Sequence, residues 1–183
     1  MEAKFSTLLL GRKEIFRNAS KAVCAPHTKQ VINTRRHCMI LRHDNKSIEF
    51  TIDGYQSPKR KSSKKEFDYE ANWLICRVVY SDGDNTETFT DPCLLTDELA
   101  ELAEEIPKVI DGTETCYISD CMEPFLKFAA ARVEDKIVII FYFAYAADGG
   151  PWKVRKISAL LSPEDAAEVA GELKELADRY PER

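Results

Sequence analysis

The sequence predicts an α+β fold, in which a curved antiparallel β-sheet of about six to eight strands packs against two helices, at about residues 96–110 and 163–179. Three observations lead to this class. Several short segments alternate apolar and polar residues, tight turn motifs join these segments, and only two segments have apolar residues at helical spacing. Strands joined by short turns must be antiparallel, and the chain lacks the regular strand–helix alternation of a parallel sheet.

The first predicted hairpin begins at Met39. A short strand over residues 39–42 is followed by the turn residues Asp44 and Asn45. Apolar residues then occupy every second position of 48–52, which is typical of a half-buried strand. The next segment, QSPKRKSSKKE at 56–66, is basic, rich in serine and contains a proline. We therefore expect it to be a solvated loop.

The second predicted hairpin spans residues 73–91. Residues 73–80 are apolar on both faces apart from Arg77, so this strand should lie inside a sheet. Asp82 and Gly83 supply the positive φ angles of a tight turn. The threonine-rich segment 86–90 favours the extended state, and Pro92 ends the strand because it cannot donate to a strand ladder.

The stretch TDPCLLTDEL, residues 90–99, connects this hairpin to the first helix. Thr96 is the predicted N-cap, and acidic residues follow in the first turn, where the helix dipole favours them. Apolar residues recur at helical spacing up to Ile106, Pro107 ends or kinks the helix, and Gly112 completes the stop. Cys93 is either a reactive thiol or a small core residue at the corner between strand and helix. The nearby acids would raise the thiol pKa, so we interpret Cys93 as core.

The second half of the chain is predicted to contain further strands and a final helix. Ser162 is the predicted N-cap of the last helix, with Pro163 at its first position. KIVIIFYFAY, from Lys136, is apolar on both faces and is the best candidate for a central strand, and Glu134 and Asp135 form the turn before it. The predicted strands are TCYIS, PFLKFAAARV, KIVIIFYFAY and KVRKISALL.

Charge divides the chain into two parts. Residues 1–38 carry eight basic and two acidic side chains, a net charge of +6, whereas residues 39–183 carry 18 basic and 29 acidic, a net charge of −11. We expect 1–38 to be a flexible basic extension, with a targeting arm as the alternative, and 39–183 to be a single α+β domain. An acidic domain disfavours direct binding to nucleic acid. It suits a basic protein partner or simply confers solubility.

The remaining composition predicts a cytoplasmic protein. No apolar run reaches the roughly 20 residues that would cross a bilayer, and the N-terminus does not resemble a signal peptide. We therefore expect no membrane interaction. The six cysteines include no CxxC pair, so we expect reduced thiols, and the close pair Cys116 and Cys121 is a weak signal for a metal.

The domain lacks the residues that most catalytic sites need. The three histidines are His27, His37 and His43, and residues 44–183 contain none. This leaves little scope for a histidine general base, a histidine metal ligand or a Ser–His or Cys–His nucleophile. Glycine-rich phosphate loops are absent as well. We expect no enzyme, no metal and no cofactor; carboxylate pairs such as Asp68 with Glu70 are the alternative.

One segment has the composition of a protein interface. FDYEANWL, residues 67–74, combines two acids, an amide and aromatic side chains, a mixture typical of interfaces. It contributes Asp68, Tyr69, Glu70 and Asn72 as candidate contact residues for a partner, and Trp152 in GGPW is a fifth. The alternative is a loop that caps the sheet, with Asn72 bonded to the backbone and Trp73 in the core.

Four motifs in order resemble the WapI-type immunity protein family, small bacterial proteins associated with contact-dependent toxins. The resemblance runs from about Ile48 to Pro181. The chain departs from the family pattern at Asp97, where an aromatic is typical, and in its lengthened basic loop at 59–65. The matching motifs are Gly54-Tyr55-Gln56, Ala71-Asn72-Trp73-Leu74, Asp91-Pro92-Cys93-Leu94-Leu95-Thr96, and Glu123-Pro124 with Leu126 and Phe128.

The resemblance implies a cytosolic protein that neutralises a cognate toxin domain, often a nuclease, by direct binding. It does not supply contact residues. It agrees with the missing catalytic residues and with the acidic domain. The alternative is a binding or scaffolding domain that has a different protein or a small ligand as its partner.

Overall fold

The computed structural model describes residues 37–58, 67–146 and 150–183. The chain divides into two units, Met1–Val31 and Ile32–Arg183, and every described residue belongs to the second. The predicted basic extension, except for His37 and Cys38, lies outside the described residues. So does the predicted basic loop from residue 59 to residue 66.

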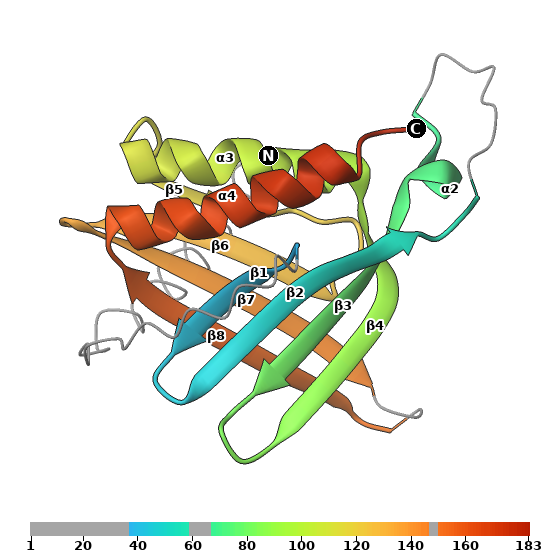
Figure 1. Cartoon of the computed structure of the whole chain (residues 1–183), viewed down its shortest axis with the longest axis horizontal. Helices are drawn as coiled ribbons and strands as arrows, with labels where there is room; N and C mark the ends of the chain where they lie inside the picture. Colours follow the sequence, from blue (N-terminus) through green and yellow to red (C-terminus); the bar gives the residue numbers. More distant parts are fainter. Residues whose placement is uncertain (1–36, 59–66, 147–149) are drawn as a thin grey trace, which may run out of the picture. The chain divides into compact units, whose positions relative to one another are not determined.

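The second unit contains one pattern twice, four antiparallel strands followed by a helix (Figure 1). A single-turn helix, α2 (Tyr69–Asn72), lies within the first copy, before its third strand. The first copy contains β1 (Met39–His43), β2 (Lys46–Tyr55), β3 (Trp73–Ser81), β4 (Thr86–Leu95) and α3 (Thr96–Asp111). The second contains β5 (Cys116–Ile118), β6 (Leu126–Val133), β7 (Lys136–Ala146), β8 (Trp152–Leu161) and α4 (Pro163–Arg179).

The predicted α+β class, the antiparallel pairing and the number of strands are confirmed. The strands form two sheets rather than one, in the orders β1-β2-β3-β4 and β5-β6-β7-β8. The reason is the insertion of α3 between β4 and β5, because a helix at that point prevents the tight turn that would make these strands neighbours. The apolar segment from Lys136 is interior as predicted, since β7 pairs with both β6 and β8.

The turns follow their residue types. Asp44 and Glu134 adopt left-handed φ angles of 53° and 56° between β1 and β2 and between β6 and β7. Gly83 has a φ of 96° in the β3–β4 connection. This connection is wider than the two-residue turn that we predicted, because the carboxylate of Asp82 accepts a hydrogen bond from the backbone N–H of Asn85 at 2.8 Å and stabilises a four-residue loop.

The two long helices begin differently. Ser162 caps α4 as predicted, and its hydroxyl accepts a hydrogen bond from the backbone N–H of Asp165 at 3.1 Å. The prediction for α3 is wrong by one residue: Leu95 is the N-cap, and Thr96 is the first helical residue. The Leu95 side chain accepts no hydrogen bond. The carboxylate of Glu98 instead accepts a hydrogen bond from the backbone N–H of Leu95 at 2.8 Å. The hydroxyl of Thr96 is thereby free to bond elsewhere.

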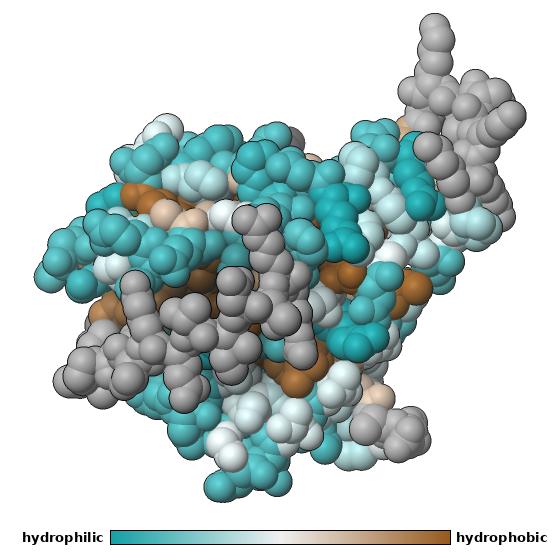
Figure 2. Space-filling view, viewed as in Figure 1, coloured by the Kyte–Doolittle hydropathy of each residue, from teal (hydrophilic) through white to brown (hydrophobic). Residues whose placement is uncertain are grey.

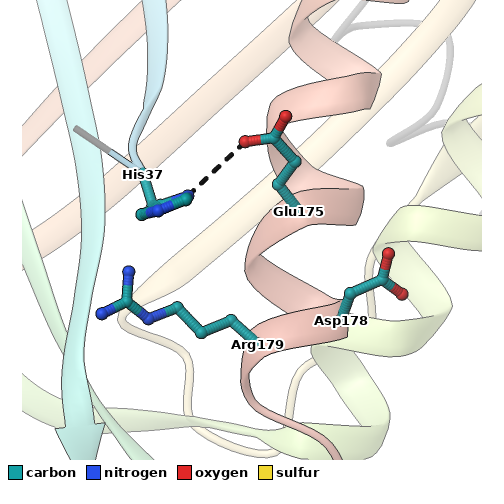
Figure 3. Close-up of a pocket in the computed structure, with 4 residues that line it drawn as sticks. All are labelled: His37, Glu175, Asp178 and Arg179. Atoms are coloured by element: carbon teal, nitrogen blue, oxygen red, sulfur yellow. Dashed lines mark ion pairs between the residues drawn. The ribbon is translucent and has the colours of Figure 1, made fainter. Parts of the chain in front are cut away.

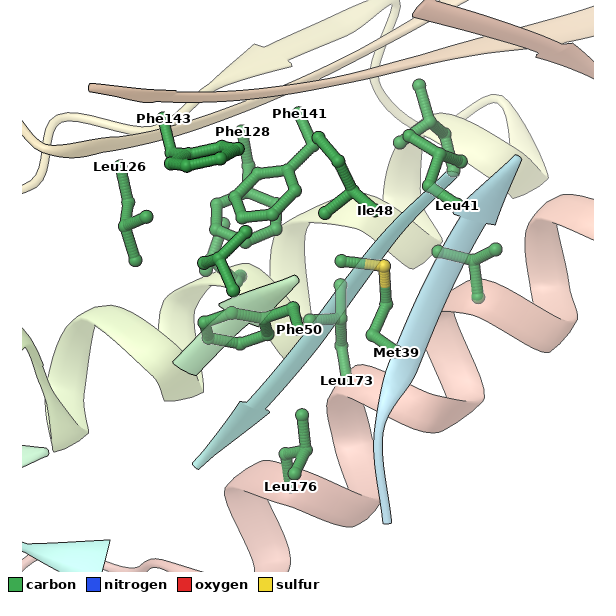
Figure 4. Packing of buried hydrophobic residues seen from close by; sticks show 14 of the residues in the cluster. Met39, Leu41, Ile48, Phe50, Leu126, Phe128, Phe141, Phe143, Leu173 and Leu176 are labelled. Carbon is green, nitrogen blue, oxygen red and sulfur yellow. The ribbon is translucent and has the colours of Figure 1, made fainter. Parts of the chain in front are cut away.

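Aromatic side chains join the two sheets. The ring of Phe50, on β2, lies 5.6 Å from that of Phe128, on β6, and 5.7 Å from that of Phe141, on β7. Figure 4 shows these rings together with Met39 and with Leu173 of α4. α3 and α4 lie side by side and add their apolar faces to the same core (Figure 1).

Candidate interaction surfaces

The short helix α2 forms an exposed aromatic corner. The carboxylate of Asp68 caps the helix by accepting a hydrogen bond from the backbone N–H of Ala71 at 3.3 Å. The Tyr69 side chain is 52% exposed, and its ring packs edge-on against Phe67 at 5.0 Å. Glu70 is exposed beside it. Three of the five predicted contact residues therefore lie together at this corner.

Asn72, the fourth predicted contact residue, is fully buried. Its amide group donates to the backbone carbonyl of Asp68 at 2.9 Å. Its carbonyl oxygen accepts from the hydroxyl of Thr96 at 3.1 Å and from the backbone N–H of Arg183 at 2.8 Å. Asn72 thus links α2, the start of α3 and the end of the chain. This arrangement agrees with the alternative prediction, in which Asn72 bonds to the backbone in a segment that caps the sheet. It leaves Asn72 out of reach of a partner in this structure.

The C-terminal residues complete this corner. The guanidinium of Arg183 lies 3.3 Å from the centre of the Tyr55 ring and donates to the carbonyl of Ser57 at 3.0 Å. The Tyr55 hydroxyl donates in turn to the carbonyl of Pro181 at 2.6 Å. These contacts join residues more than 120 positions apart, and sequence reasoning missed them. The Gly54-Tyr55-Gln56 motif was the only signal that marked the region.

Trp152, the fifth predicted contact residue, lies at the start of β8. Its side chain is 62% exposed, and its ring stacks on that of Phe125 at 5.5 Å with an angle of 10° between the planes. β8, which begins at Trp152, and α2 lie at two separate places in the unit (Figure 1), so the structure does not bring the five predicted residues into one surface.

The acidic side chains are concentrated on the two long helices. α3 carries six acidic residues and one basic residue, and α4 carries six acidic and two basic, a combined net charge of −9. Figure 2 shows hydrophilic residues over the outward side of both helices. Among the described residues, no exposed large apolar side chain belongs to α3 or α4. The helices therefore offer charge to a partner, but no apolar anchor.

A depression of about 540 Å³ lies between the segment before β1 and the end of α4 (Figure 3). His37, Glu175, Asp178 and Arg179 line it, and Nδ1 of His37 is 3.5 Å from a carboxylate oxygen of Glu175. Figure 3 shows Arg179 extending towards His37 while Asp178 points away. Within the described ranges, no group of three or more histidine, cysteine or acidic side chains could hold a metal ion. We find no convergent catalytic arrangement in this depression.

The thiols at the strand–helix corner are inaccessible. Cys93 is fully buried, which confirms its interpretation as a core residue. Cys76, also fully buried, lies beside it, and burial raises the pKa of the Cys76 thiol well above its usual value. Burial also raises the pKa of Cys121 to about 11. The thiols of Cys76 and Cys121 are therefore protonated at neutral pH, which disfavours nucleophilic chemistry by either of them.

Comparison with known protein families matches the chain to one that includes its predicted motifs. A model of the immunity protein WapI-like family matches residues 39–181. The match includes all four motifs that carried the resemblance and begins at Met39, earlier than the Ile48 expected from those motifs. None of the curated proteins matches the chain. In the part of the chain that the structure describes, no helix is both long enough and apolar enough to cross a bilayer.

Proposed function

The chain belongs to the WapI-like immunity protein family, and we propose that it neutralises a cognate toxin domain by binding to it directly and occluding its working surface. The family match over residues 39–181 is the observation that carries this proposal. The protein acts in the cytoplasm, where its thiols remain reduced.

Binding rather than catalysis is the proposed mode of action. Residues 44–183 contain no histidine, and Cys93 is fully buried in the core. Such a fold supports function through surface complementarity, in which a few buried anchors determine the affinity and charge determines the speed of encounter. The alternative is a binding or scaffolding domain for another protein or a small ligand.

A nuclease is the proposed class of toxin. Nucleases bind polyanions and are often basic, and the acidic helices α3 and α4 would attract a basic protein over distances comparable to the Debye length. We propose Asp68, Tyr69, Glu70 and Trp152 as contact residues. The buried Asn72 supports this surface by holding α2 in place.

Co-expression with a toxin domain encoded beside this gene tests the proposal. Cells that make the toxin should survive only when this protein is present, and the two purified proteins should form a one-to-one complex in size-exclusion chromatography and calorimetry. An unrelated toxin of the same class is the control, because a specific immunity protein should not protect against it. Equal killing by the cognate toxin with and without this protein would refute the proposal.

A further inference from the structure

Two of the exposed large apolar side chains are neighbours on one face of one strand. Among the described residues these side chains are Tyr69, Met122, Val133, Trp152 and Val154. Trp152 is 62% exposed and Val154 is 50% exposed, and they are two positions apart on β8, so both point to the outer face of the second sheet. An exposed tryptophan beside an exposed valine is a common feature of protein-binding surfaces.

The tryptophan ring is held in place and stands clear of the sheet. Its cross-strand partner on β7 is Ala146, and that of Val154 is Ala144, so the side chains beside the ring on β7 are small. Phe125 stacks on the ring, and the Phe125 ring is itself 6.4 Å from that of the buried Phe89. The stack therefore connects the exposed ring to the core. A ring that is ordered before binding loses little conformational entropy on binding.

The charge around this ring is positive. Strand alternation places Lys127, Lys136 and Lys156 on the outer face of the second sheet, and the strands β5–β8 contain no acidic residue at all. Lys127 and Lys156 flank Tyr142 in one cross-strand row, directly beside the row that contains Val154. This face therefore has the opposite charge to α3 and α4, although the chain as a whole carries −5.

We propose that the Trp152 patch, defined as Trp152, Val154, Phe125, Lys127 and Lys156, anchors the toxin domain. This inference rests on the proposed function and deepens it. The toxin surface that fits the patch has an apolar pocket for the indole ring and carboxylates at the rim for the two lysines. A nuclease that is basic overall is compatible with this requirement, because metal-dependent nuclease centres are lined by carboxylates.

Two other assignments fit the structure less well. A symmetric dimer through the patch would bring the lysines of two copies together without any acid on the same face to compensate them. The acidic helices would meet a basic partner, but they expose no large apolar side chain that could supply a binding hot spot. The Trp152 patch combines an aromatic anchor with two lysines in the neighbouring cross-strand row.

Calorimetry and stopped-flow binding with the toxin domain encoded beside this gene test the inference. Trp152→Ala should weaken binding at least about 30-fold, the effect of a hot-spot residue. The double variant Lys127→Glu/Lys156→Glu should slow association and reduce its dependence on salt. Val133→Ala is the control: it removes an exposed apolar side chain at the far end of β6, and its affinity should stay within about threefold of wild type. The helix variant Glu101→Lys/Glu104→Lys should slow association, because it weakens the attraction of α3 for a basic partner, but should leave the dissociation rate unchanged.

Each outcome decides one question. If wild type does not bind the toxin, the proposed function fails and the inference fails with it. If wild type binds and both patch variants bind equally well, only the inference is overturned; loss of binding in the helix variant alone would assign the contact to α3. Should Trp152→Ala unfold, as judged by circular dichroism, the exposed lysine variant decides. Patch-dependent binding to phosphatidylglycerol vesicles, with toxin binding unaffected, would also overturn the inference.

Discussion

Replacing Asn72 by alanine should destabilise the protein, because this one amide joins three segments. The side chain is fully buried, and it connects α2 to the first residue of α3 and to Arg183, 111 positions later. Alanine removes the amide and leaves its former partners behind. The hydroxyl of Thr96, in a residue only 3% exposed, would then lack an acceptor inside the protein.

The magnitude follows from the hydrogen bonds. Three are well formed, at 2.8, 2.9 and 3.1 Å, and a fourth, to the carbonyl of Arg183, is weak at 3.4 Å. Each well-formed bond contributes about 1 kcal/mol, and a partner that stays buried and unpaired costs about 1–3 kcal/mol. Water reaches the two partly buried backbone partners after the change. We therefore expect Asn72→Ala to lower the free energy of unfolding by about 2–4 kcal/mol.

Urea denaturation followed by circular dichroism measures this loss. The midpoint should fall while the slope with denaturant stays constant, because the native fold is retained. Asn85→Ala is the matched control: Asn85 is exposed and its amide makes only a 3.5 Å contact, so its loss should stay within about 0.5 kcal/mol. An Asn72→Ala midpoint equal to that of Asn85→Ala would refute the assignment of Asn72 as a link between segments.

Three further predictions concern stability. Phe128→Ala should lower the free energy of unfolding by about 3–5 kcal/mol in denaturant titrations, because its ring is 1% exposed and stacks on a neighbouring ring at 4.3 Å; a loss under about 1 kcal/mol would contradict the two-sheet core. Gly112→Ala should lower the free energy of unfolding by about 1 kcal/mol, because φ is 87° at this position, whereas Gly171→Ala within α4 should raise it by a similar amount. Melting temperatures that shift in the same direction for both variants would contradict this. Arg155 hydrogen-bonds Glu87 and lowers its pKa to about 2, so the carboxylate stabilises the fold above about pH 4.5 and loses this effect as the pH falls towards 2. The stability difference between wild type and Glu87→Gln should shrink over that range, and a constant difference would argue against the ion pair.

Local patterns predicted the elements because their causes are local. Alternation of apolar residues identified β2, and helical spacing with Ser162 as cap identified α4, since each signal depends on residues only a few positions apart. The N-cap of α3 was misplaced for a tertiary reason. The hydroxyl of Thr96 bonds to Asn72 rather than to its own helix, and that competition is invisible to local patterns.

The candidate surface was only partly predictable. Tyr69 and Trp152, which the sequence put forward as contact residues, are both exposed. The same pattern included Asn72, which is buried, because composition does not distinguish a contact residue from the residue that supports it. The stacking of Phe125 on Trp152 requires β6, β7 and β8 to be paired in register, so the strand sequences alone could not reveal it.

The sequence by itself determined the α+β class, the antiparallel hairpins, the core position of Cys93 and the family. All of these follow from periodicity, turn residues or motif order within short segments. Only the tertiary structure decided that eight strands form two sheets, that the C-terminal residues complete the α2 corner, and that acidic helices and a lysine-bearing sheet face form separate surfaces. These features depend on which distant segments pack together, and packing is selected by the burial and hydrogen bonding of the whole domain rather than by any one segment.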